Sequence, residues 1–234
     1  MNGSVSGIET LGTLDGPGLR TVIFLNGCML RCKFCHNPEM FKIGKLNASP
    51  EDILNKVKRY KIYYKRNNGG VTFSGGEPLF QTDFLIETCK LLKKENIHIA
   101  LDTAGVGIGD YNTLLDYIDL IIFDVKSTTR AGFLDLTRGD FNKVLEFLKI
   151  ANSKNKKFWV RQVIIPGIND NEEYIKSLKI FIDENIKNVE KIELLPFHNM
   201  AKKKYINLGL PYEYSDLPSM NKERLKDLYK YLED

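Results

Sequence analysis

The hydrophobic positions of the chain follow two alternating patterns. Short runs rich in β-branched and aromatic residues, typical of strands, lie at 20–25, 70–74, 97–102, 120–124, 158–165 and 191–195. Segments of helical periodicity lie between them, and the clearest places apolar residues at i, i+1, i+4, i+7 and i+8: Tyr174, Ile175, Leu178, Phe181 and Ile182. Strands that alternate with helices predict parallel strands joined by right-handed crossovers.

The number of strand–helix units narrows the architecture. Six units are two short of a complete eight-fold barrel, which leaves an open doubly wound sheet or a partial barrel. Both arrangements place ligands at the carboxyl ends of the strands, so the polar residues after each strand are the candidates for function. No Pro/Gly-rich linker divides the 234 residues, and we expect a single α/β domain, 1–234.

Composition and charge exclude several classes of function. The chain has 34 basic and 30 acidic residues, a net charge of +4, which is too mild to indicate nucleic-acid or anionic-membrane binding. No apolar run approaches the roughly 18 residues of a membrane span. Residues 1–10 are polar and lack a hydrophobic signal region. We therefore expect a cytoplasmic protein with neither a nucleic-acid nor a membrane partner.

Three of the four cysteines are clustered. Cys28, Cys32 and Cys35 fall within eight residues, in a loop at 26–38 directly after the first predicted strand. Cys89 lies alone in a helical apolar stripe, where we expect an inert core thiol. Clustered thiols in a cytosolic chain indicate metal binding or redox chemistry rather than a disulfide framework.

The cysteine spacing alone leaves three interpretations open. His36 could complete a Cys3His zinc site. Cys32 and Cys35 could form a thioredoxin-like redox pair, but Cys28 is then unexplained. An iron–sulfur cluster held by three thiolates would keep one iron without a protein ligand, open to a substrate or cofactor.

Polar residues end or follow the other predicted strands, in the order Gly75-Gly76-Glu77, Asp102-Thr103, Asp124, Lys126, Arg161 and His198. Two glycines permit close approach of the backbone to a ligand, and the Glu77 carboxylate could receive an ammonium group. Asp124 and Lys126 are two residues apart, so they share a face on extended backbone. A guanidinium in an apolar strand, as at Arg161, is costly unless it meets an anion. Each residue could be structural alone, but all converge on the rim that carries the cysteine loop.

This ordered set of motifs resembles the radical S-adenosylmethionine superfamily, and within it the glycyl-radical-enzyme activases. The supporting stretches run through almost the whole chain, at 13–20, 28–37, 70–78, 102–103, 124–126, 160–167 and 193–198. The resemblance implies a partial (β/α)6 TIM-like barrel. It also implies a 4Fe–4S cluster held by Cys28, Cys32 and Cys35, whose open iron binds the amino and carboxylate groups of S-adenosylmethionine.

The resemblance also implies roles for the other candidates. The residues implied to bind S-adenosylmethionine are Phe34, Gly75, Gly76, Glu77, Asp102, Asp124, Lys126, Arg161 and His198. A monovalent cation, Na+ or K+, would bind Asp102, Thr103, the Ile122 carbonyl and Asp124. Asp15 and His36 match residues that position the glycine-bearing loop of the partner enzyme.

The implied reaction is reductive cleavage of S-adenosylmethionine to a 5′-deoxyadenosyl radical, which takes a hydrogen from one glycine α-carbon of a glycyl radical enzyme. Only Cys89 remains for an auxiliary cluster, which favours the compact type that acts on pyruvate formate-lyase. The segment 127–138 is shorter than usual in the family and lacks a histidine, so another glycyl radical enzyme stays an alternative partner. A flavodoxin or ferredoxin is the expected electron donor and a monomer the default state. The alternative from another class is a zinc-stabilised, non-enzymatic binding protein.

Overall fold

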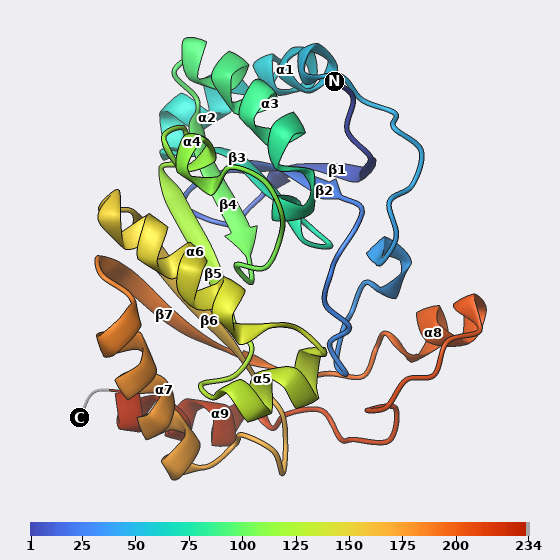
Figure 1. The fold of residues 1–234 in the computed structure, drawn as a ribbon, viewed down its shortest axis with the longest axis vertical. Helices are drawn as coiled ribbons and strands as arrows, with labels where there is room; N and C mark the ends of the chain where they lie inside the picture. The colour runs from blue at the N-terminus through green and yellow to red at the C-terminus, as the bar shows by residue number, and fades with distance from the viewer. Residues whose placement is uncertain (233–234) are drawn as a thin grey trace.

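The computed structural model describes residues 1–232 and contains one seven-stranded sheet. Its strands are β1 (Val5–Gly12), β2 (Arg20–Leu25), β3 (Gly70–Gly75), β4 (His98–Thr103), β5 (Leu120–Val125), β6 (Lys157–Ile164) and β7 (Val189–Pro196). They lie side by side in chain order; β2 to β7 are parallel, and β1 pairs with β2 in the antiparallel direction. The sheet is not closed, because β1 and β7 are its two edges (Figure 1). The fold is the predicted partial barrel of six parallel strands, with one additional strand.

The additional strand, β1, was missed in the hydrophobic pattern. It lies at an edge of the sheet, and most of its residues are partly or fully exposed. An edge strand needs fewer apolar residues than a strand buried on both faces, so its sequence carries a weaker signal. The glycines at its third and last positions, Gly7 and Gly12, weaken that signal further, because glycine is uncommon in strands.

Helices cover the outer face of the sheet (Figure 1). The α-helices are α1 (Pro50–Lys58), α2 (Lys61–Asn67), α3 (Thr82–Lys94), α4 (Tyr111–Leu115), α5 (Arg130–Thr137), α6 (Phe141–Ser153), α7 (Glu172–Asn185), α8 (Lys202–Leu208) and α9 (Lys222–Leu228). The 3-10 turns are η1 (Pro38–Met40), η2 (Pro78–Gln81) and η3 (Tyr229–Leu232). Cys89 of α3 is fully buried in this core, as predicted. No helix within residues 1–232 has the length and apolarity needed to cross a bilayer.

The alternation of side chains along the strands separates the core from the candidate site. Ile121 and Phe123 of β5 join the large core between sheet and helices. Ile122 points the other way and packs in a small apolar cluster with Ala100, Leu120 and Trp159. Asp124 continues that same inner face toward the carboxyl end of the strand. The inner face of the sheet is therefore apolar toward the amino ends of the strands and polar at their carboxyl ends.

Candidate active site

The carboxyl ends of the strands and the cysteine loop enclose a cavity of about 270 Å³. Thirteen of the candidate residues line it: Cys28, Cys32, Phe34, Cys35, His36, Gly75, Gly76, Glu77, Asp102, Thr103, Asp124, Lys126 and Arg161. Asp15, Ile122 and His198 lie outside this lining. Candidate residues from the four strands β3 to β6, from the turns after them and from the cysteine loop thus meet at one place, as the parallel topology predicts.

Backbone hydrogen bonds hold the cysteine loop at its base and in its middle. The Gly27 N–H donates to the Met40 carbonyl at 2.8 Å, which closes the base of the loop. The Arg31 and Lys33 N–H groups donate at 2.8 and 2.9 Å to carbonyls at the end of α5. Phe34 is only 4% exposed and packs in an apolar cluster away from the main core. These contacts fix the loop over the cavity without using a thiol.

The three thiols are free and partly buried. Burial raises the pKa of Cys28 and Cys32 to about 12, and it also raises the pKa of Cys35. In the described chain no group of three or more His, Cys, Asp or Glu side chains is arranged to hold a metal ion; the thiols share the lining of one cavity instead. Three soft thiolate donors fit an iron–sulfur cluster, whose iron would offset the cost of ionising buried thiols.

Gly75 and Gly76 join β3 to the base of the cysteine loop. Gly75 has φ +121°, and a Cβ at Gly76 would lie 2.5 Å from the Gly27 carbonyl oxygen. The Gly76 and Glu77 N–H groups donate at 2.8 Å to the carbonyls of Leu25 and Gly27. Both glycines are therefore required by close backbone packing, whatever else they bind.

The Glu77 carboxylate is occupied by donors of this chain. It is 1% exposed and accepts hydrogen bonds from the Leu79 N–H, the Thr103 hydroxyl and the Ala104 N–H, at 3.1, 2.5 and 2.9 Å. Burial raises the pKa of Glu77 to about 7 although these donors oppose the shift. Three donors of the chain thus use part of the capacity of this carboxylate to accept hydrogen bonds from an ammonium group.

A charged cluster occupies the ends of β4 and β5. The Lys126 ammonium donates to the Asp124 carboxylate at 2.7 Å, which confirms that the two side chains share a face. The ammonium also lies 5.3 Å from the centre of the Phe34 ring. Burial, together with the charges of Asp124 and Asp15, raises the pKa of Asp102 to about 6, and Ser74 donates to this carboxylate at 2.7 Å. The Arg161 guanidinium also acts on both carboxylates and opposes the rise in the Asp102 pKa.

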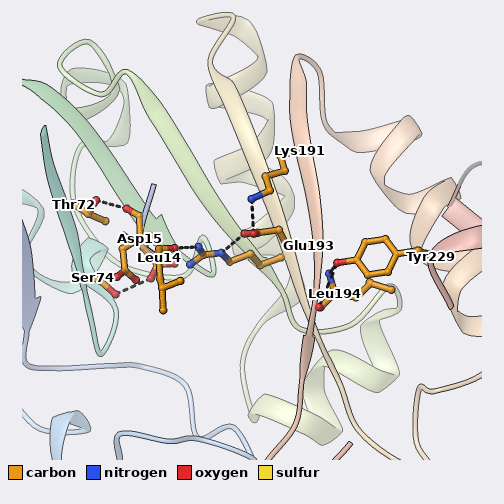
Figure 2. A network of polar contacts seen from close by, with 10 residues as sticks. Leu14, Asp15, Thr72, Ser74, Lys191, Glu193, Leu194 and Tyr229 are labelled. Atoms are coloured by element: carbon orange, nitrogen blue, oxygen red, sulfur yellow. Dashed lines mark hydrogen bonds and ion pairs between the residues drawn. The ribbon is translucent and has the colours of Figure 1, made fainter. Parts of the chain in front are cut away.

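Arg161 links the cavity to the loop before β2. Its Nε donates to the Glu193 carboxylate at 3.0 Å, and a terminal nitrogen donates to the Leu14 carbonyl. Glu193 also pairs with Lys191, 2.6 Å away. Figure 2 shows Glu193 between Lys191 and the guanidinium that reaches Leu14. The predicted anion for Arg161 is thus supplied by the chain itself, with further attraction from Asp102.

Asp15 lies on the same loop, next to Leu14, and is anchored through its backbone. Its carbonyl accepts a hydrogen bond from the Thr72 hydroxyl at 2.5 Å (Figure 2). Thr72 in turn accepts from Nε of the fully buried Arg20 at 2.9 Å. The Asp15 carboxylate takes no part in this anchor, and its charge acts on Asp102 of the cavity lining.

His36 and His198 form a stacked pair beside the cavity. Their ring centres are 4.0 Å apart, and Nε2 of His36 lies 2.8 Å from the His198 carbonyl oxygen. Burial lowers the pKa of His36, which favours the neutral ring. Nδ1 of His198 is buried without a hydrogen-bond partner in the described chain. A buried nitrogen without a hydrogen-bond partner costs free energy, so this atom is suited to a polar ligand that would supply the partner.

Sequence reasoning did not identify several residues at this site. The cavity is also lined by Leu30, Asn37, Phe41, Ser74, Ala104, Val163 and Leu195. Ser74 belongs to the Gly-Gly-Glu motif and could have been found from its place at a strand end. Glu193 lies in the carboxyl half of β7 and could have been found from that position. The contacts of Asn37 and Phe41 depend on the path of the loop, which no short motif predicts.

The sequence matches the family model described as the radical SAM superfamily over residues 22–179. The matched segment begins in β2 and ends in α7, and it includes the cysteine loop together with most of the cavity lining. The chain therefore belongs to the radical S-adenosylmethionine superfamily. Membership implies a 4Fe–4S cluster and S-adenosylmethionine, and it favours the cluster interpretation of the three cysteines over zinc or a thiol pair.

Relatives with curated names narrow the assignment. The chain is 44% identical over 233 residues to the pyruvate formate-lyase-activating enzyme of Clostridium pasteurianum. The aligned region covers 99% of this chain and 98% of that protein. It is 35% identical over 241 residues to the enzyme of the same name from Staphylococcus epidermidis, with 99% and 96% covered. Within the superfamily, the chain is an enzyme of the pyruvate formate-lyase-activating family.

Comparison with solved structures supports the fold but not the particular activity. The chain resembles the crystal structure of a radical SAM methyltransferase from Sphaerobacter thermophilus with a TM-score of 0.63 and 14% identity, over 99% of this chain and 74% of that one. At this identity the likeness concerns the fold alone. It supports the partial barrel as the shared architecture of the superfamily.

Proposed function

We propose that this chain activates pyruvate formate-lyase by installing a glycyl radical. When bound, the cluster would supply the electron that cleaves S-adenosylmethionine to methionine and a 5′-deoxyadenosyl radical, which takes one hydrogen atom from a glycine α-carbon of the partner. The chain contributes binding, orientation and exclusion of water. The observation that carries the proposal is one cavity whose lining includes three thiols, two glycines and five acidic or basic side chains from the strands and the turns that follow them.

The residues of this cavity suit the charges of S-adenosylmethionine. Cys28, Cys32 and Cys35 would hold the cluster, and Phe34 would pack beside it. Lys126 and Arg161 offer positive charge for the cofactor carboxylate, whereas the carbonyls of Gly75 and Gly76 offer acceptors for its ammonium. Glu77 would act mainly by joining the turn after β3 to the end of β4, because Leu79, Thr103 and Ala104 already donate to its carboxylate.

The ribose and cation sites are assigned on similar grounds. Asp124 and His198 would bind the ribose hydroxyls, and the unpartnered Nδ1 of His198 supports this role. Asp102, Thr103, the Ile122 carbonyl and Asp124 would hold a monovalent cation, Na+ or K+. The raised pKa of Asp102, due to burial and the nearby Asp124 charge, supports a bound cation that relieves this repulsion.

The curated relatives support one partner for the reaction. The names of two curated relatives support pyruvate formate-lyase as the partner. His36, in the cavity lining, and Asp15, next to the Leu14 carbonyl that Arg161 contacts, would position the partner's glycine loop. We propose that the enzyme works in the cytoplasm as a monomer and receives its electron from a flavodoxin or ferredoxin.

The decisive experiment is detection of the radical itself. Anaerobically loaded enzyme, S-adenosylmethionine and a one-electron reductant are mixed with pyruvate formate-lyase, and the glycyl radical is measured by EPR. We expect a signal on the partner with the wild-type enzyme and none with Cys32→Ser. Cofactor cleavage without any partner radical, while another glycyl radical enzyme is activated, would reassign the partner. Absence of radical on every glycyl radical enzyme would overturn the proposal.

A further inference from the structure

The loop between β1 and β2, residues 13–19, is held by side chains of two distant strands. Arg161 of β6 donates to the Leu14 carbonyl, and Thr72 of β3 donates to the Asp15 carbonyl at 2.5 Å (Figure 2). Two consecutive carbonyls are thus bound by strands that have β4 and β5 between them in the sheet. The β1–β2 loop therefore lies across the inner face of the partial barrel.

A fully buried guanidinium supports the same loop. Nε of Arg20, in β2, donates to the Thr72 hydroxyl at 2.9 Å. One terminal nitrogen of Arg20 lies 3.4 Å from the Pro17 carbonyl oxygen and 3.1 Å from Nδ1 of His98. The other terminal nitrogen donates to the Val71 carbonyl. The Thr72 hydroxyl therefore accepts from the guanidinium and donates to the loop, so it joins the two.

The surroundings of Arg20 are unusual for a charged group. Within residues 1–232 it forms no ion pair with a carboxylate, and its acceptors are two carbonyls, a hydroxyl and an imidazole nitrogen. Burial lowers the pKa of Arg20 to about 10, so the guanidinium is charged near neutral pH. A buried charge without a counter-ion costs free energy even when its donors are satisfied. Two of its contacts lead to carbonyls of the β1–β2 loop, directly at Pro17 and through Thr72 at Asp15, which favours a role in the placement of that loop.

The loop that is held in this way presents an apolar side chain to solvent. Leu14 is 79% exposed, although its carbonyl is bound by Arg161 of the cavity lining. Gly16 permits the close approach of the loop to Arg20, since its φ is +123° and an added Cβ would lie 3.3 Å from Nε. Leu14 and Asp15 are thus kept in a fixed orientation next to a cavity residue. A surface that is ordered before binding loses less conformational entropy when a partner binds.

We propose that Arg20 and Thr72 are positioning residues that hold the β1–β2 loop so that Leu14 and Asp15 contact the glycine-bearing loop of the partner enzyme. The inference rests on the proposed function, because it requires that partner. Leu14 offers apolar area, and the Asp15 carboxylate can accept hydrogen bonds from backbone N–H groups of a peptide. Arg20 and Thr72 do not line the cavity, so they act only through the loop.

The test compares Thr72→Val with Thr88→Val in full-length, cluster-loaded enzyme. Valine replaces the hydroxyl with a methyl group at nearly the same volume. Thr88 is the matched control, because it is also fully buried and its hydroxyl donates to the Phe84 carbonyl at 2.7 Å within α3. Thr72→Ser, which keeps a hydroxyl, is the conservative variant. Calorimetry with S-adenosylmethionine and without reductant gives the Kd for pyruvate formate-lyase.

We expect Thr72→Val to raise this Kd about tenfold, and Thr88→Val and Thr72→Ser to change it by less than about twofold. Methionine release with a reductant and without the partner should stay within about twofold of wild type in all three variants. In an Asp15→Asn background, Thr72→Val should raise the Kd much less than tenfold, because the two residues act on one contact. A general loss of stability would instead multiply the two effects.

A photo-cross-linker tests the loop in a chain that keeps both positioning residues. p-Benzoylphenylalanine at position 14 should cross-link to pyruvate formate-lyase under light. The same amino acid at position 180 should not, since Ile180 is an exposed residue of α7, at 57%, that has no contact with the loop. This measurement decides the case if Thr72→Val fails to fold.

Several results would overturn the inference. They are an unchanged Kd in Thr72→Val, an equal rise in both valine variants, and a multiplicative effect in the Asp15→Asn background. No cross-link at position 14, or equal cross-linking at positions 14 and 180, would also reject it. Failure of the wild-type enzyme to bind and activate pyruvate formate-lyase would instead reject the proposed partner, and this inference with it.

Discussion

The Glu193 carboxylate holds Nε of Arg161 at 3.0 Å, and Arg161 in turn reaches the Leu14 carbonyl. A side chain of β7 thereby positions a cavity residue and the loop that carries Asp15. The pair is largely buried, with 11% and 22% of the two side chains exposed, so solvent weakens it less than a surface pair. The cofactor cavity and the rim where a partner would bind are physically connected through this contact.

Glu193→Gln should weaken the binding of S-adenosylmethionine. The substitution removes a charge-assisted hydrogen bond, so the guanidinium is less firmly oriented toward the cavity. We expect the Kd to rise about tenfold, measured by calorimetry on anaerobically loaded protein. Lys191→Gln is the control, because it removes the more exposed partner of Glu193 and should change the Kd less. Unchanged affinity in Glu193→Gln would show that Glu193 does not position Arg161.

Asp15→Asn should separate cofactor cleavage from radical transfer. The loop is anchored through the Asp15 carbonyl and the Thr72 hydroxyl, so replacement of the carboxylate leaves this anchor in place. We expect methionine release from S-adenosylmethionine to stay measurable, while EPR shows slower radical formation on the partner. Equal loss of both activities would refute a role of Asp15 toward the partner.

Gly76→Ala should destabilise the protein. The new Cβ would lie 2.5 Å from the Gly27 carbonyl oxygen and 2.9 Å from the Met40 carbonyl oxygen, both backbone atoms that cannot move aside cheaply. We expect the free energy of unfolding to fall by about 2–4 kcal/mol in urea titrations. Gly7→Ala in β1 is the matched control, since no atom lies within 4 Å of its added Cβ. Equal stability of the two variants would contradict the close packing under the cysteine loop.

The stability of the fold should depend on pH through Glu77. Burial raises its pKa from 4.5 to about 7, against the opposing effect of its hydrogen bonds. A carboxyl with a raised folded pKa contributes stability that is complete below its unfolded pKa and is lost as pH rises through about 7. We expect the unfolding free energy to fall over this range, by up to about 3 kcal/mol from this group.

Glu77→Gln tests this assignment, because glutamine does not titrate. Urea unfolding between about pH 4.5 and pH 8 should show a shallower decline in the variant than in wild type. A smaller slope should remain, since burial also raises the pKa of Asp102, to about 6, and this acts in the same direction. A wild-type stability that rises with pH, or an unchanged slope in Glu77→Gln, would contradict the role given to Glu77.

The parallel strands could be predicted because they are buried on both faces and read as short apolar runs. The edge strand β1 could not, because half-exposed residues and two glycines hide its pattern. The meeting of Asp102, Asp124 and Lys126 was predictable in outline, since the carboxyl ends of parallel strands lie at one edge of a sheet.

The finer contacts of the site depend on tertiary structure. Glu77 receives donors from Thr103 and Ala104, which are 26 and 27 residues away along the chain, so no local pattern reveals that its carboxylate is occupied. Arg161 was expected to meet an anion, but the choice of Glu193 depends on the register of β6 and β7. The stack of Tyr212 on Tyr205 of α8 depends on the turn at Gly209. Lys204, which is 168 residues from His36 along the chain, donates to the His36 carbonyl and so holds that helix to the cysteine loop.

The most direct test of the account is the metal content of protein purified without oxygen. A cluster bound by Cys28, Cys32 and Cys35 predicts a brown protein with about four irons and four sulfides per chain, and an EPR signal of the reduced cluster that changes when S-adenosylmethionine is added. A colourless protein with about one zinc per chain and no sulfide would contradict it, and the radical chemistry proposed for this cavity would then be rejected.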